Sequence, residues 1–269
     1  MKKVLLVIAS YKDWRQKLFE EKISPINERY AQHHDFEYMV ITNPPPLLRG
    51  NPTWWKFSIP QQMIKDGKLK DGDIITHLDA DMLIAKQDTS YETKKSFSYA
   101  IDSGNTHCMG NYTITVNEWS RNMIEQIMSE ERYKALGETD FWQEFREQAN
   151  WYSMTGTIRH SWKSFWEMPN YGWHSSPSKH LLYSIEELNE HVEVRGTEWN
   201  ATLLQEEEEH QGHLNQFLIN KCPMRDVRIR HWAGGQPWRV DAWRKFIFDA
   251  HRYNYWDRKP EDERHKYDC

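Results

Sequence analysis

The sequence predicts an α/β fold, with a mostly parallel central sheet flanked by helices in a single domain that spans residues 1–269. Residues 4–9 form a fully apolar run, rich in β-branched side chains, of the kind that builds a central parallel strand. A helical pattern over residues 14–31 separates this run from a second strand-like run at residues 36–42. The order strand, helix, strand at this spacing is typical of the start of a parallel α/β sheet.

A third strand-like run, residues 74–78, leads directly into two carboxylates, Asp79 and Asp81. Alternation along an extended chain would place both side chains on the same side. Like charges held this close repel each other unless a cation lies between them, and Mg²⁺ or Mn²⁺ binds carboxylate and phosphate oxygens. Ligands of open α/β sheets bind at the carboxyl ends of the strands. This pattern favours a divalent-cation site, and a solvated acidic turn after a strand is the alternative that the spacing alone leaves open.

Further segments with helix or strand patterns follow along the chain. The expected helices lie at residues 54–67, 122–136 (capped by Asn117 or Ser120), 140–152 and 238–255. The expected strands lie at residues 106–116, 192–195 and 227–231. No linker, repeat or composition shift divides the chain, so one domain is expected.

The composition argues against several classes of protein. Charged residues make up 28% of the chain and the formal net charge is -5, which disfavours a nucleic-acid partner. Cys108, Cys222 and Cys269 form neither a C-x-x-C pair nor a disulfide framework, so a reducing compartment is expected. No apolar run approaches the roughly 20 residues of a membrane span, and the apolar start ends at Ala9 without a clear cleavage site. We therefore expect a soluble, cytoplasmic protein.

Short motifs in a consistent order connect this chain to a known group of enzymes. They are Tyr30 to Tyr38, Trp55-Lys56, residues 75–82, residues 115–120, Glu147-Gln148, Trp199-Asn200 and residues 231–237, with His231 followed by Gly234-Gly235. Together they cover roughly residues 30–245, and they resemble the GT-A glycosyltransferases. More narrowly, the chain resembles the galactosyl/xylosyltransferase family, which contains yeast α-galactosyl- and α-mannosyltransferases and plant xyloglucan α-xylosyltransferases.

The resemblance implies a GT-A type, Rossmann-like sheet and a metal-dependent, retaining glycosyltransferase. Such an enzyme uses Mn²⁺ or Mg²⁺ and moves a sugar of the xylose or galactose type from a nucleotide-sugar to a saccharide or glycan acceptor. UDP is the nucleotide that this branch implies. A GDP-mannose-dependent mannosyltransferase is the alternative within the same class, and a non-catalytic carbohydrate-binding protein is the alternative outside it.

The resemblance also implies roles for individual residues. The metal ligands would be Asp79, Asp81 and His231, with Asp79 binding either the metal or the donor ribose. Contacts to the donor nucleotide would come from Ala9, Tyr11, Lys56, Asp79, Gly234 and Gly235. Other interpretations stay open: His231 as a packed core histidine, Lys56 as an exposed helix lysine and Tyr11 as a core aromatic.

Glu147 and Gln148 match the position where the family carries an acidic residue and Gln near the sugar, so they are the predicted catalytic residues. Glu in place of Asp moves the carboxylate by one methylene, so no nucleophile is assigned, and a surface salt bridge is the alternative. Residues 109–111 depart from the family's Asn-Thr-Gly. The aromatic insert at residues 151–185, which contains Trp166 and Trp173, is predicted to bind the acceptor.

Two other metal-dependent enzyme classes fit less well. A sugar-1-phosphate nucleotidyltransferase would open with a Gly-rich basic loop after the first strand, and residues 9–13 are not such a loop. A phosphatase with an Asp-x-Asp pair would carry the pair after its first strand, whereas Asp79 and Asp81 follow the third.

Overall fold

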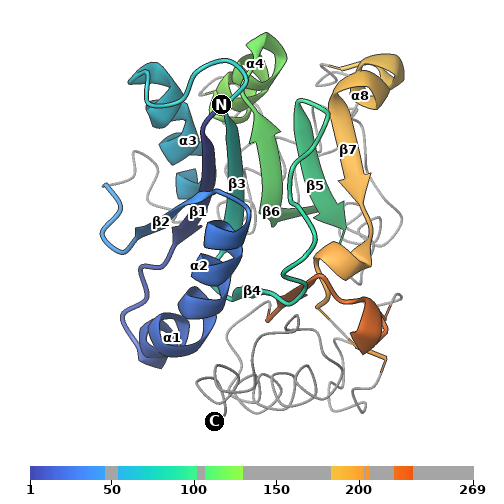
Figure 1. Cartoon of the computed structure of the whole chain (residues 1–269). Coiled ribbons are helices and arrows are strands. Elements are labelled where there is room, and N and C mark those ends of the chain that lie inside the picture. The colour runs from blue at the N-terminus through green and yellow to red at the C-terminus, as the bar shows by residue number, and fades with distance from the viewer. Residues whose placement is uncertain (46–53, 102–106, 130–182, 203, 206–220, 233–269) are drawn as a thin grey trace, which may run out of the picture.

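A computed structural model describes residues 1–45, 54–101, 107–129, 183–202, 204–205 and 221–232. Its main feature is a six-stranded sheet with the order β2-β1-β3-β6-β5-β7 (Figure 1). The strands are β1 (Lys3–Ile8), β2 (Glu37–Ile41), β3 (Ile74–Asp79), β5 (Phe97–Ile101), β6 (His107–Thr115) and β7 (Val192–Arg195). Strands β2, β1 and β3 are parallel, β6 is antiparallel to both of its neighbours, and β7 is parallel to β5. The expected α/β fold with a mixed, mostly parallel sheet is thus confirmed.

Helices cover both faces of this sheet. They are α1 (Trp14–Leu18), α2 (Ser24–His33), α3 (Trp55–Lys65), α4 (Glu118–Ile127) and α8 (Ile185–His191). Leu5 and Val7 of β1 pack with the residues of α2, while Val4 and Leu6 pack with those of α3 and α4. Because successive side chains of β1 enter opposite cores, this strand is apolar from Val4 to Ile8, as its sequence predicts.

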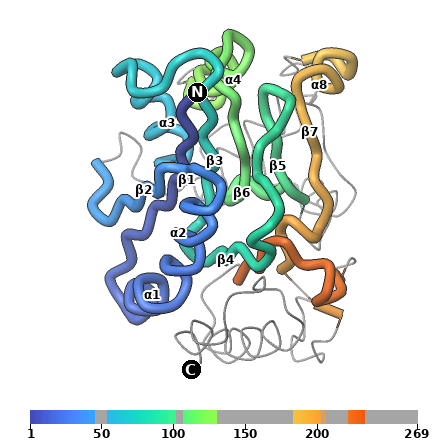
Figure 2. The backbone as a smooth tube through the Cα atoms, in the orientation of Figure 1, coloured from blue at the N-terminus to red at the C-terminus, as the bar shows by residue number. Residues whose placement is uncertain are grey.

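A second, two-stranded sheet lies beside the first and joins distant parts of the chain. Strand β4 (Met82–Ile84) directly follows the acidic pair, and it pairs antiparallel with β8 (Ile229–His231). Figure 2 shows the orange segment that contains β8 running alongside β4 at one end of the large sheet. This pairing brings residues that are about 150 positions apart in the sequence to the end of β3.

The predicted helix over residues 14–31 is confirmed as one continuous helical stretch with an irregular centre. Between α1 and α2, residues Phe19–Ile23 form a wide turn of π-helix, η1. Pro25 follows in the first turn of α2 and has no N–H to donate, so the regular ladder is interrupted there. The two halves still bury Phe19, Ile23 and Tyr30 in one core.

The structure corrects several predicted boundaries. Helix α4 begins at Glu118 and ends at Ile127, not at residues 122–136, because Asn117 and Ser120 form a capping box that starts it earlier. Strand β5 and helix α8 were not predicted. The predicted helices at residues 140–152 and 238–255 lie outside the described residues, as does the insert at residues 151–185 except for its last three positions. Within the part of the chain that is described, no helix is long and apolar enough to cross a membrane.

Asn27 anchors β4 to helix α2. Its side-chain Nδ2 donates to the Met82 carbonyl at 2.9 Å, and its Oδ1 accepts from the Ile84 N–H at 2.9 Å. Asn27, Met82 and Ile84 are all completely buried. One amide therefore satisfies two backbone groups of the strand that follows the acidic pair.

Replacing Asn27 with Ala should destabilise the fold. It leaves two buried backbone groups unpaired at about 1–3 kcal/mol each, so we expect the free energy of unfolding in urea to fall by about 2–4 kcal/mol. Gln32→Ala, an exposed position on the same helix, is the matched control and should change it by less than about 0.5 kcal/mol. If Asn27→Ala lowered the free energy of unfolding no more than Gln32→Ala, water would have replaced both Asn27 hydrogen bonds to β4.

Candidate functional site

The two carboxylates of the acidic pair lie at the carboxyl end of β3. Asp79 is the last residue of the strand, Ala80 and Asp81 form a turn, and β4 begins at Met82. The two side chains therefore do not lie along one extended strand, as the alternation argument had assumed. They converge because the chain turns between the large and the small sheet.

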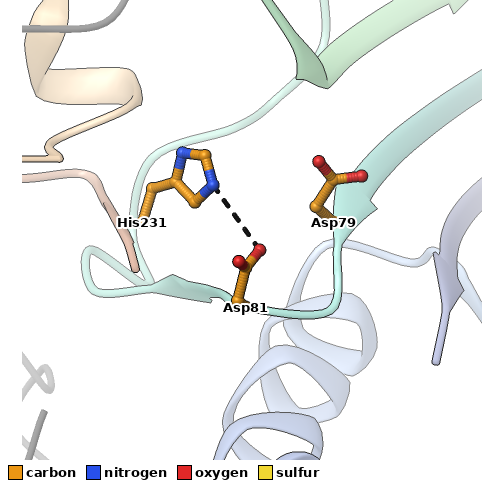
Figure 3. A group of neighbouring side chains, drawn as sticks. All are labelled: Asp79, Asp81 and His231. Atoms are coloured by element: carbon orange, nitrogen blue, oxygen red, sulfur yellow. Dashed lines mark ion pairs between the residues drawn. The ribbon is translucent and has the colours of Figure 1, made fainter. Parts of the chain in front are cut away.

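His231 reaches the acidic pair through the small sheet. It is the register partner of Met82, and the N–H of the next residue, Trp232, donates to the Asp81 carbonyl at 3.0 Å. The imidazole Nε2 lies 3.5 Å from Asp81 Oδ1. One ligand atom from each of Asp79, Asp81 and His231 lies within 4.8 Å of the other two, and all three side chains face a common centre (Figure 3).

Two further side chains, the cation Lys56 and the hydrogen-bond donor His77, hold Asp79 from the protein side. Lys56 Nζ lies 3.4 Å from Asp79 Oδ1, and His77 Nε2 lies 3.0 Å from the same oxygen. Burial acts to raise the pKa of the Asp79 carboxyl, but the Lys56 ammonium and His77 outweigh it and hold the pKa well below its ordinary value. Asp79 is therefore ionised at all physiological pH values. Lys56 is neither exposed nor free, since only 7% of it is accessible.

His77 was not identified from the sequence. It lies two residues before Asp79 on β3, so alternation places both on the same face, and this spacing could have revealed it. Burial lowers the pKa of His77, with Asp79 acting in the opposite direction. A neutral His77 that donates its Nε2–H to Asp79 agrees with both observations.

His231 carries the opposite shift. Burial alone would lower the pKa of His231, but the Asp81 carboxylate, with a smaller contribution from Cys108, raises it to about 10. The ring is thus an imidazolium at neutral pH in the absence of a metal. Its positive charge takes the place that a cation would occupy beside Asp81.

The chemistry of these three side chains fits a divalent metal ion. Two carboxylates that stay ionised close together need positive charge between them, and carboxylate ligands suit Mg²⁺ and Mn²⁺. An imidazole as third ligand is compatible with Mn²⁺ and also suits borderline transition metals such as iron, nickel and zinc. Asp79, Asp81 and His231 can therefore hold a metal ion. His231 is buried, as the alternative of a packed core histidine expects, and its Nε2 lies 3.5 Å from the Asp81 carboxylate.

A pocket of about 700 Å³ opens at the carboxyl ends of β1 and β3. Its wall combines the end of β1 and the loop after it, the first turn of α3, and the acidic turn. The lining residues are Ile8, Ser10, Tyr11, Lys12, Asp13, Arg15, Trp55, Lys56, His77, Asp79, Ala80 and Asp81. A pocket of this size at this edge is where α/β sheets bind ligands.

Not all predicted donor contacts line this pocket. Tyr11, Lys56 and Asp79 do, whereas Ala9 is fully buried in the core and bonds to β2 through its backbone. Gly234, Gly235, Glu147 and Gln148 lie outside the described residues. Trp166 and Trp173 lie outside them as well.

Arg15 is a pocket residue that the sequence did not single out. Its guanidinium lies over the Tyr11 ring at 4.6 Å from the centroid and forms an ion pair with Asp13 at 2.8 Å. The Asp13 carboxylate also accepts the Arg15 backbone N–H and begins α1. The loop therefore presents an aromatic ring backed by a cation.

Gly110 of β6 makes room for the Asp79 carboxylate. A Cβ at this position would lie 2.8 Å from Asp79 Cγ, which is closer than real Cβ contacts come, and would overlap with Oδ2. The end of the Met82 side chain would lie at 3.0 Å. Gly110 does not have a positive φ, so glycine is needed here for the space it leaves and not for its backbone conformation.

Gly110→Ala should therefore displace Asp79 without unfolding the protein. We expect Mn²⁺ affinity, measured by electron paramagnetic resonance, to fall at least about tenfold, as it does when groups that orient a metal ligand are lost. The free energy of unfolding should change by less than about 1.5 kcal/mol, because the clash is with the ends of side chains and not with backbone. Unchanged Mn²⁺ affinity would show that Asp79 does not need this space.

The raised pKa of His231 predicts a pH-dependent metal affinity. Below a pKa of about 10 the ring carries a proton that the metal must displace, so affinity rises with pH. We expect Mn²⁺ affinity to increase by up to about tenfold per pH unit between pH 6.5 and 8.5, because one proton leaves per ion bound. In His231→Gln the same titration should be nearly flat. A steep slope in that variant would assign the proton to another group.

Comparisons with known proteins give a likeness of arrangement only. No protein-family model matches the sequence, and no curated protein matches it. Among solved structures, the chain is similar to a glycosyltransferase involved in the glycosylation of the major capsid of PBCV-1. The two share 9% sequence identity with a TM-score of 0.48, over 90% of this chain and 100% of that chain. The chemistry of the site therefore has to follow from its own residues.

Proposed function

We propose that this protein is a metal-dependent glycosyltransferase that takes its sugar from a nucleotide-sugar donor. The observation that carries the proposal is the cluster of Asp79, Asp81 and His231 beside a pocket of about 700 Å³ at the carboxyl ends of β1 and β3. A nucleoside diphosphate needs both features: a cation site for its phosphates and a cleft for its base and ribose. The motif resemblance to GT-A glycosyltransferases points to the same chemistry.

The charges of the pocket support a diphosphate ligand. Lys12, Arg15 and Lys56 balance three carboxylates, which belong to Asp13, Asp79 and Asp81. A divalent cation bound at the acidic pair would leave the pocket with net positive charge, which suits an anion. When bound, the cation stabilises the negative charge that develops on the departing diphosphate.

Individual residues take complementary roles in this proposal. Asp81 and His231 hold the cation, and Asp79 holds the cation or the donor ribose. Lys56, already at the acidic pair, adds a positive charge next to the phosphates. Tyr11, backed by Arg15, offers a ring on which the nucleobase can stack.

The finer assignments follow from the family resemblance. They are a UDP-sugar donor of the xylose or galactose type, retention of configuration, Mn²⁺ or Mg²⁺ as the metal, Glu147 and Gln148 beside the transferred sugar, and the insert at residues 151–185 as the saccharide-binding region. GDP-mannose is the alternative donor.

A thermal-shift panel tests the proposal. UDP, GDP and their sugar conjugates are each added with Mn²⁺ and with a chelator. A ligand at 100 times its Kd stabilises the native state by about 2.7 kcal/mol, so we expect one nucleotide series to raise Tm by roughly 5 °C or more, only with Mn²⁺. Asp81→Asn should abolish the shift, whereas Asp35→Asn, an exposed aspartate in a turn, should leave it intact.

The pattern of shifts separates the alternatives. A shift with GDP and GDP-mannose, but not with UDP, would favour the mannosyltransferase. A shift with free sugars that ignores both nucleotide and metal would replace the enzyme with a carbohydrate-binding protein.

A further inference from the structure

The second ring nitrogen of His231 has a partner of its own. His231 Nδ1 lies 2.8 Å from the side-chain oxygen Oδ1 of Asn200. Figure 3 shows that this nitrogen points away from both aspartates, while Nε2 points toward Asp81. Asn200 is completely buried and only 7% of His231 is accessible. Water therefore does not compete for this bond.

The bond fixes which way the ring faces. An amide oxygen can only accept a hydrogen bond, so Nδ1 carries the hydrogen and donates it to Asn200. Rotating the ring by half a turn would break this bond and turn Nε2 away from Asp81. A histidine that binds a metal through one nitrogen is oriented in this way by an acceptor on the other.

The backbone around Asn200 is joined to β8. The Ala201 N–H donates to the Ile229 carbonyl at 2.9 Å, and the His231 N–H donates to the Ala201 carbonyl at 3.1 Å. The Asn200 N–H bonds back to Thr197 at 3.0 Å and closes the short helix η4 (Thr197–Trp199). The side chains of Asn200 and His231 are thus carried by two segments that cannot slide past each other.

Trp199, the residue before Asn200, is held in place by contacts of its side chain and its backbone. Two guanidinium groups contact its ring, with Arg195 Cζ at 4.5 Å and Arg228 Cζ at 4.9 Å from the ring centroid. Its carbonyl accepts a hydrogen bond from the Asn111 side chain of β6. Contacts from three different strands or loops therefore hold the backbone that presents Asn200.

We propose that Asn200 is a positioning residue for His231, whose amide oxygen holds the imidazole so that Nε2 faces the metal bound by Asp79 and Asp81. The inference rests on the proposed metal site and adds a residue that does not touch the ion. Among the described residues, Asn200 Nδ2 has no hydrogen-bond partner. The acceptor oxygen is therefore the part of this side chain that the site uses.

The test compares two substitutions by direct Mn²⁺ binding without nucleotide, measured by electron paramagnetic resonance. Asn200→Ala removes the acceptor, and we expect the affinity to fall about 10- to 100-fold. Asn200→Asp keeps an acceptor oxygen at the same place and replaces the unpaired Nδ2 with a second, negatively charged oxygen. Because a carboxylate also accepts the N–H of a metal-binding histidine, its affinity should stay within about threefold of wild type. This rescue separates orientation of the ring from simple packing.

Two controls make the result specific. Asn117→Ala removes the half-buried N-cap of helix α4, which lowers stability without touching the cluster. Its Mn²⁺ affinity should equal that of wild type. Asp81→Asn should abolish binding. In each variant, the downfield proton resonance of the His231 Nδ1–H, assigned by ¹⁵N-histidine labelling, reports the bond itself. It should persist in wild type and Asn200→Asp and vanish in Asn200→Ala.

The outcomes are distinct. Wild-type affinity in Asn200→Ala, or equal losses in Asn200→Ala and Asn200→Asp, would overturn the role of Asn200 and leave the metal site intact. No Mn²⁺ binding by the wild type, or undiminished binding by Asp81→Asn, would overturn the metal site, and the proposed function and this inference with it.

Discussion

The structure depends on one electrostatic constraint, which is that two carboxylates are held close together at the end of a buried strand. Asp79 and Asp81 cannot stay ionised side by side without positive charge around them. The protein supplies Lys56 and His77 on the side of Asp79 and His231 on the side of Asp81. These three residues come from different elements, namely α3, β3 and β8. Removing positive charge from this place would make the close approach unfavourable.

The small sheet of β4 and β8 is what brings these parts together. The chain leaves the large sheet at Asp79, turns, and at once pairs with a strand from the far end of the sequence. Asn27 secures β4 from the helix side, and the backbone of Ala201 secures β8 from the other. The cluster is therefore built on paired backbone, which holds side chains more accurately than an open loop does.

The same site accounts for the opposite pKa shifts of two histidines. His77 and His231 are both buried, yet His77 stays neutral while the pKa of His231 rises to about 10. His77 shares Asp79 with Lys56, whose positive charge disfavours a second cation there. His231 instead faces Asp81, whose negative charge raises its pKa. The neutral ring serves as a hydrogen-bond donor, and the charged one holds the place that a metal ion can take.

The sequence by itself determined the local elements and the acidic pair. Apolar runs predicted β1, β2 and β3, and strand alternation could also have revealed His77. Strand β5 and helix α8 were not predicted, because they are short and gain their stability from tertiary packing. Only the tertiary structure decided that His231 faces Asp81, that Gly110 leaves space for Asp79 and that Asn200 orients His231. These are contacts between distant segments, which depend on the pairing of strands and not on any spacing along the chain.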